Sequence, residues 1–243
     1  MTKDLKIPFQ DGRRNLLKGA LISGIGVGSG VLPSTQANAG NTTSGKDSSN
    51  EAPGYVFLTP SEADWVEALV NHMIPADHLT PSGSELGVNI FIDRALNDGW
   101  GKGDRLYLDG PWEKGTATQG YQLPLTPAQL YRSGIAASDS YCEKTYGMKF
   151  SALNKTQKEE FLKAMQSGKV VFVAGPPSKV FFDLAYQTVV EGFFADPIYG
   201  GNANKEAWRM LGFPGVIATH TNNISTYKNK PYSAKTFSIQ DVS

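Results

Sequence analysis

The stretch SKVFFDLAYQTVVEGFFA (residues 178–195) decides the fold class. Its apolar and small side chains recur every three or four residues, at Phe181, Phe182, Leu184, Ala185, Thr188 and Val189. Residues with this spacing share one face of an α-helix. The stretch therefore predicts a helix over residues 178–195 that packs one face into a core.

Similar patterns predict further helices on both sides of this one. Thr59 as N-cap, Pro60 at the first helical position and Glu62 completing a capping box predict a helix that ends before Pro75. Others are expected at residues 88–96, 126–146, 153–167 and 205–211. No run alternates with period two for long enough to indicate a sheet. The expected fold is all-α, a single helical domain over residues 55–218 with long ordered loops and an extended C-terminal tail at 219–243.

One long connection interrupts the helical pattern. Residues 99–124 are rich in Gly, Asp and aromatic side chains and predict an ordered loop. Loops of this length in compact domains are usually functional or take part in interfaces.

The first 39 residues have the features of a twin-arginine signal peptide. Arg13 and Arg14 lie in a basic region, a short glycine-diluted apolar stretch follows, and Ala37-Asn38-Ala39 supplies a signal-peptidase site with small residues at both ends. A disordered basic tail and an uncleaved anchor are the alternative interpretations. Residues 40–54, rich in Gly, Ser, Thr and Asn, predict a flexible linker. Because the twin-arginine translocase moves folded cargo, this leader indicates a cofactor or partner acquired before export to the periplasm.

Charge and cysteine content narrow the function. The chain carries 23 Lys+Arg and 23 Asp+Glu. Because the leader holds more basic than acidic residues, the remainder has a net charge of about −3, which gives no support for nucleic-acid binding. The single cysteine, Cys142, excludes an internal disulfide, an iron–sulfur cluster with four thiolates and a Cys-x-x-Cys-His haem site. Any redox centre of a system containing this chain is expected on another chain.

No catalytic constellation is evident. His72 and His78 lie on either side of Pro75, so they do not share a helix face as metal ligands, and His220 lies far along the chain. The chain has no Gly-x-Ser-x-Gly motif and no Walker A motif, and no Gly-x-Gly-x-x-Gly motif follows a strand. We therefore expect no catalytic, cofactor-binding or metal-binding residue on this chain.

The most unusual segment is EGFFADPIYGGN (residues 191–202), which predicts a rigid aromatic turn at a helix end. Composition leaves two interpretations open. The turn is either an internal hydrophobic plug or a partner interface in which aromatic side chains act as anchors. The candidate interface residues are Phe193, Phe194, Asp196, Pro197, Tyr199, Gly200, Gly201 and the nearby Trp208.

This segment, continuing through Trp208 to Gly212-Phe213-Pro214-Gly215, resembles the gluconate 2-dehydrogenase subunit 3 family. Phe57-Leu58-Thr59, Ile74-Pro75-Ala76-Asp77 and Phe91-Ile92-Asp93-Arg94-Ala95-Leu96 are also similar to it. The resemblance implies a heterotrimer in the periplasm, associated with the inner membrane. Its expected partners are a large FAD-dependent, GMC-type dehydrogenase subunit and a multihaem cytochrome c. It further implies that the small subunit carries the flavoprotein through the translocon. The insertion at 99–124 resembles gluconate-type members.

Two interpretations of the whole chain and two of its cysteine remain open. The chain is either a non-catalytic small subunit or an independent exported helical enzyme such as a periplasmic hydrolase. Cys142 is either a buried small hydrophobe or an interface thiol that forms a disulfide with the flavoprotein.

Overall fold

The computed structural model describes residues 54–116, 118–216, 221–232 and 234–242. The predicted leader and linker, with Arg13, Arg14, Ala37 and Ala39, lie outside the described residues. The segment 112–122 and the helical body are separate compact units, and each is described by itself. Within the segment, a turn forms in which the Thr116 N–H donates to the side chain of Gln119 at 2.7 Å.

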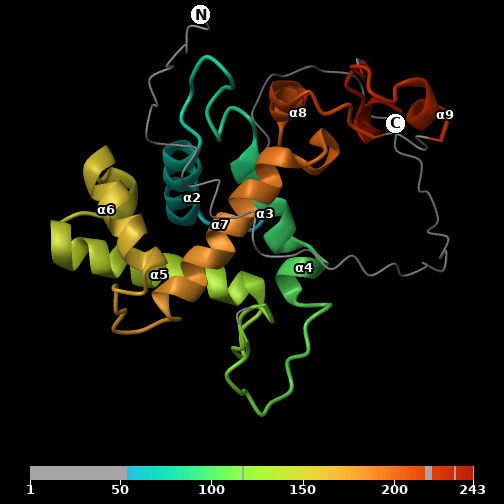
Figure 1. Cartoon of the computed structure of the whole chain (residues 1–243). Helices are drawn as coiled ribbons and strands as arrows, with labels where there is room; N and C mark the ends of the chain where they lie inside the picture. Colours follow the sequence, from blue (N-terminus) through green and yellow to red (C-terminus); the bar gives the residue numbers. More distant parts are fainter. Residues whose placement is uncertain (1–53, 117, 217–220, 233, 243) are drawn as a thin grey trace, which may run out of the picture. The chain divides into compact units, whose positions relative to one another are not determined.

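The described residues form eight α-helices and no β-strand, as the all-α prediction requires (Figure 1). The helices are α2 (Pro60–Met73), α3 (Val88–Asn97), α4 (Gly99–Lys102), α5 (Pro127–Tyr146), α6 (Lys155–Gln166), α7 (Ser178–Phe194), α8 (Glu206–Leu211) and α9 (Thr221–Thr226). Short 3₁₀ helices, among them η2 (Phe150–Ala152), η3 (Pro197–Tyr199) and η5 (Ile239–Asp241), lie between or after them. In Figure 1, α7 runs through the middle of the helical body, where α3, α5, α6 and α8 contact it.

Local sequence signals set the helix ends. Thr59 and Glu62 form the predicted capping box at the start of α2, and Thr126 with Gln129 forms another at the start of α5. Such caps pair backbone N–H groups that have no partner within the helix. Gly147 ends α5 in the left-handed conformation, at φ 77°.

Two predicted boundaries are wrong. The first four residues of the expected loop 99–124 are the helix α4. The tail predicted to be extended contains the helix α9 and the 3₁₀ helix η5. All three elements have six residues or fewer and are too short for a hydrophobic repeat to reveal them.

An aromatic cluster joins four helical elements in the core. The ring of Trp65 on α2 lies 5.0 Å from Phe150 of η2 and 5.3 Å from Phe181 of α7, measured between centroids. Phe181 also meets Tyr131 of α5 edge-on at 5.8 Å. A Cβ on Gly134 would lie 2.3 Å from the Phe181 ring, so α5 needs glycine where α7 crosses it. The apolar face predicted for residues 178–195 is therefore the centre of the core.

Glycine also lets the chain fold back along the end of α7. A Cβ on Gly201 would lie 2.1 Å from the carbonyl oxygen of Gly192, one turn from the end of that helix. Real Cβ atoms do not approach an oxygen this closely, and the obstacle is backbone that cannot rotate away. The return of the chain after η3 therefore requires a residue without a side chain at position 201.

We expect Gly201→Ala to lower the free energy of unfolding by about 1–3 kcal/mol, because the added methyl group forces the two backbone segments apart. Urea denaturation of the full chain measures this change. Gly54→Ala is the matched control, since no atom lies within 4 Å of a Cβ there. An unchanged denaturation midpoint for Gly201→Ala would contradict the close contact.

Candidate partner interface

The turn at residues 191–202, called here the signature turn, is built around the buried carboxylate of Asp196. Its Oδ1 accepts the N–H of Ile198 at 3.1 Å and caps the 3₁₀ helix η3. Its Oδ2 accepts the N–H of Ile239, from the C-terminal segment, at 2.7 Å. A buried carboxylate is tolerated when hydrogen bonds satisfy it. Asp196 therefore holds the turn together rather than facing a partner.

Two further polar side chains attach α8 to the end of α7. Asn202 donates through Nδ2 to the Ala195 carbonyl at 2.9 Å and accepts the Ala207 N–H at 2.9 Å. The indole Nε1–H of Trp208 donates to the Phe194 carbonyl at 2.8 Å. Carbonyls at a helix C-terminus lack partners within the helix, so these two bonds cap α7 from outside.

The structure divides the predicted interface residues into a buried and an exposed group. Phe193, Asp196, Gly201 and Trp208 are buried, and Phe194, Pro197 and Gly200 are partly buried. Tyr199 is the exception, with 57 % of its surface exposed. Its neighbour Ile198, which sequence reasoning did not select, is 40 % exposed. The buried residues therefore fit the plug interpretation, and the interface interpretation remains a prediction for the exposed Tyr199.

Of the two interpretations of Cys142, the structure supports the buried small hydrophobe and contradicts the accessible interface thiol. Cys142 is fully buried, and burial raises the pKa of its thiol to about 12. Tyr131, Ile135, Ser138 and Cys142 recur at helical spacing on the buried face of α5. The polar neighbours of Cys142 in sequence lie on other faces of the helix, so they say nothing about its own environment.

Sequence reasoning also missed the role of Asp93. This buried carboxylate on α3 accepts three backbone N–H groups, from Val56 at 2.8 Å, Phe57 at 2.9 Å and Leu58 at 2.8 Å. It fixes the start of the helical domain onto α3. An acidic residue within an otherwise apolar helix face was the signal that could have identified it.

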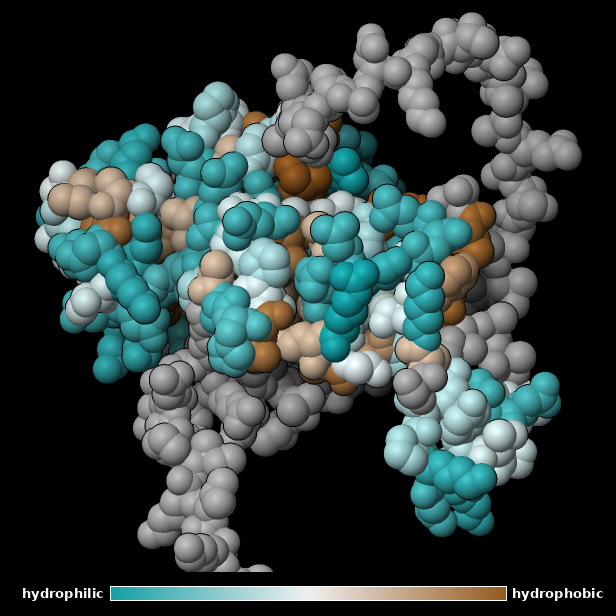
Figure 2. All heavy atoms as spheres, turned by 90° about the horizontal axis from the view of Figure 1, so that it is seen from above, coloured by the Kyte–Doolittle hydropathy of each residue, from teal (hydrophilic) through white to brown (hydrophobic). Residues whose placement is uncertain are grey.

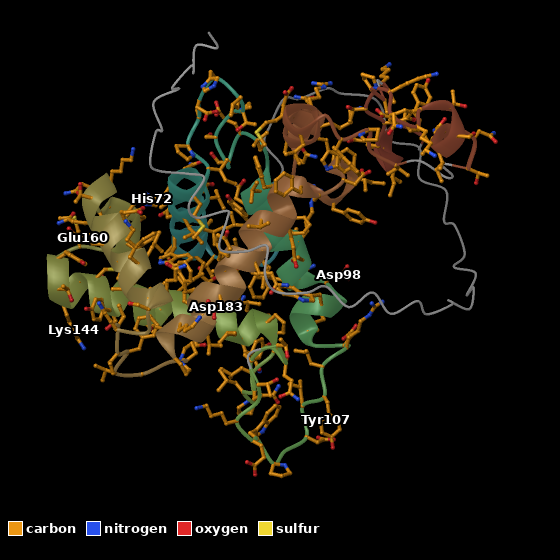
Figure 3. All side chains as sticks on the ribbon, in the orientation of Figure 1. His72, Asp98, Tyr107, Lys144, Glu160 and Asp183 are labelled. Atoms are coloured by element: carbon orange, nitrogen blue, oxygen red, sulfur yellow. The ribbon has the colours of Figure 1, made fainter. Side chains whose placement is uncertain are left out.

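A groove of about 600 Å³ lies beside α2. Asp64, Glu67, His72, Lys155 and Lys158 are among the residues that line it. His72, which Figure 3 shows between α2 and α6, bonds Glu159 at 2.8 Å through Nε2. His78 is exposed and does not line the groove. Nothing in this arrangement pairs a nucleophile with a base.

The described residues contain neither a cluster of metal ligands nor a helix that could span a membrane. In this part of the chain no three His, Cys, Asp or Glu side chains gather as metal ligands would. Over residues 54–242, leaving out the undescribed positions, no helix has the length and apolar character needed to span a membrane.

A family model described as gluconate 2-dehydrogenase subunit 3 matches residues 60–215, more than half of the chain. The chain belongs to this family. No curated protein and no solved structure matches the chain.

In this gluconate 2-dehydrogenase subunit 3 protein, the ends of the family match coincide with structural features. The matched region begins at Pro60, the first residue of α2, and ends at Gly215. It includes the whole signature turn and α8, but none of the C-terminal segment that bonds to Asp196. The family region therefore contains the turn, and the C-terminal segment lies outside it.

We expect Cys142 to be unreactive toward 5,5′-dithiobis(2-nitrobenzoate) in the native chain, because the thiol is buried and its pKa is raised. It should react once urea unfolds the protein. Ser140→Cys in a Cys142→Ala background is the control, because position 140 is exposed on the same helix and should react at once. Rapid modification of Cys142 in the folded wild type would contradict its burial.

Proposed function

We propose that the chain is the small, non-catalytic subunit of a gluconate 2-dehydrogenase-type complex. In this proposal it binds the large FAD-dependent, GMC-type dehydrogenase subunit, while a multihaem cytochrome c accepts the electrons. FAD and haem c belong to the partners and not to this chain. The observation that carries the proposal is the family match together with a signature turn whose polar groups are satisfied internally and whose Ile198 and Tyr199 face outward.

The chemistry of the described residues supports a binding role. Tyr side chains offer a large, rigid contact surface and are enriched at interfaces. The fixed backbone around Tyr199 adds to this, because a preorganised turn loses little conformational entropy when a partner binds. The groove beside α2, in contrast, supplies no arrangement for hydrolysis, so no observation favours the exported hydrolase.

The proposal includes export. The twin-arginine leader predicted at residues 1–39 would direct the chain, with the flavoprotein already folded and loaded with FAD, through the translocase to the periplasm. One leader would then serve two chains. The complex would remain at the inner membrane through its other subunits.

Replacing Arg13 and Arg14 by Lys should leave both this chain and the flavoprotein in the cytoplasm, because the translocase recognises the arginine pair. Cell fractionation followed by gluconate dehydrogenase assay and immunoblotting of each fraction tests this. Replacing Lys3 and Lys6 by Arg is the control, since it keeps the basic region and the pair. Active dehydrogenase in the periplasm of the Arg13→Lys/Arg14→Lys strain would refute shared export.

The double variant Ile198→Ala/Tyr199→Ala should weaken association with the flavoprotein at least about 10-fold, as expected when hot-spot side chains are removed. Its unfolding free energy should change little, because exposed side chains contribute little to stability. Pull-down with a tagged chain, followed by titration of the captured flavoprotein, measures the affinity. Met148→Ala is the control, with 40 % exposure in the loop after α5. Unchanged affinity with lowered stability would show that the turn is core alone.

A further inference from the structure

The C-terminal segment at residues 237–242, called here the clasp, is hydrogen-bonded to the signature turn and to residues 214–216. The N–H of Ile239 donates to Asp196 within the turn at 2.7 Å. Phe237 donates to the Pro214 carbonyl at 3.0 Å and accepts the Val216 N–H at 2.8 Å. A Cβ on Gly215 would lie 1.9 Å from the Phe237 carbonyl oxygen, so this pairing needs glycine at the end of the family region. The clasp is therefore docked by backbone bonds and not merely adjacent.

An ion pair adds a third attachment. The Lys205 ammonium donates to both carboxylate oxygens of Asp241, at 2.8 and 2.7 Å. These bonds, with those from the backbone and hydroxyl of Ser238, lower the pKa of Asp241 to about 2. Asp241 is thus ionised, and the attachment intact, throughout the physiological pH range.

The backbone at and just before Lys205, which forms this ion pair, is strained. Asn202, Asn204 and Lys205 have φ values of 49°, 56° and 62°, and only one other non-glycine residue of the described chain has a positive φ. Asn tolerates this left-handed region, whereas Lys rarely adopts it. Such strain persists only where surrounding contacts enforce it, and it concentrates at functional sites. The Asp241 carboxylate is the contact that holds the Lys205 side chain here.

The turn, residues 213–216 and the clasp together expose a set of apolar side chains. Between 37 and 69 % of each is exposed in Ile198, Tyr199, Phe213, Val216, Phe237, Ile239 and Val242. Two ion pairs lie beside these side chains, Lys205 with Asp241 and Arg209 with Glu206 at 2.8 Å. Hydrophobic residues also reach the surface in separate places on the face in Figure 2, so exposure alone would not single out this set. What distinguishes it is that hydrogen bonds fix its three segments to one another.

We infer that the clasp is the second half of the surface that binds the dehydrogenase flavoprotein subunit, and that Asp241 and Lys205 position it. The inference rests on the proposed function. Its basis is continuity: the carboxylate that caps the turn of Tyr199 also accepts the N–H of Ile239. A partner that covers Tyr199 therefore meets the clasp. Because the exposed side chains of the turn and the clasp are apolar and Lys205 pairs with Asp241, the partner surface it fits is apolar and aromatic rather than ionic.

The test measures affinity for the flavoprotein captured by pull-down, with full-length variants of this chain. Phe237→Ala/Ile239→Ala removes two clasp side chains but no clasp hydrogen bond, and should weaken binding at least about 10-fold, as for other interface anchors. Asp241→Asn removes the ion pair while its amide oxygen can still accept the Ser238 N–H; it should weaken binding less. Ile224→Ala is the control, since this residue of α9 is 72 % exposed in the same tail but outside the clasp. It should bind as the wild type does.

A second measurement needs no substitution. Amide hydrogen exchange of the wild-type chain, with and without the flavoprotein, should slow at residues 237–242 as well as at 198–199. Clasp variants that bind as the wild type does, or clasp amides that gain no protection while the turn does, would overturn the inference and leave the proposed function standing. Failure of the wild-type chain to bind the flavoprotein would instead reject the proposed function. A homodimer of the isolated chain that the clasp variant dissociates would also overturn the inference, by making a second copy the occupant.

Discussion

The conformation of the signature turn depends on the close approach of Gly201 to the carbonyl of Gly192. Because Gly201 has no side chain, the chain can reverse after η3 and run back against the helix that precedes it. This reversal brings Asn202 to the Ala195 carbonyl and Trp208 to the Phe194 carbonyl, so the end of α7 is capped by residues that follow it. The same reversal leaves Ile198 and Tyr199 at the outer side of the turn.

This arrangement separates two tasks that are mixed in the sequence. The side chains of Asp196, Asn202 and Trp208 form hydrogen bonds with backbone groups, and these bonds fix the conformation of the turn. The Tyr199 side chain makes no such bond, and 57 % of its surface is exposed. A fixed backbone carrying exposed side chains is the form that a binding surface takes when little entropy is to be lost on association.

The sequence predicted the helices well where a cap and a hydrophobic repeat coincide, as at Thr59 and Thr126. It failed where only tertiary contacts decide. Cys142 has polar sequence neighbours, yet the helical repeat from Tyr131 places it in the core. The C-terminal tail at 219–243 was expected to be extended, because the six-residue helix α9 and the 3₁₀ helix η5 leave no periodicity to detect. The division of the turn into buried and exposed halves likewise depends on where α3 and α8 lie, which local pattern does not encode.

The positions of the two buried aspartates point to how the small domain is built for association. Asp93 binds the backbone that enters the domain after the predicted leader and linker, and Asp196 binds the backbone of the clasp at the other end of the chain. Each carboxylate replaces water with several fixed N–H donors, and a buried carboxylate left without them would be costly. Residues 56–58 and the clasp are thereby tied to α3 and to the end of α7. The elements that present Tyr199 and Phe237 are thus held by hydrogen bonds inside this subunit, before any partner binds.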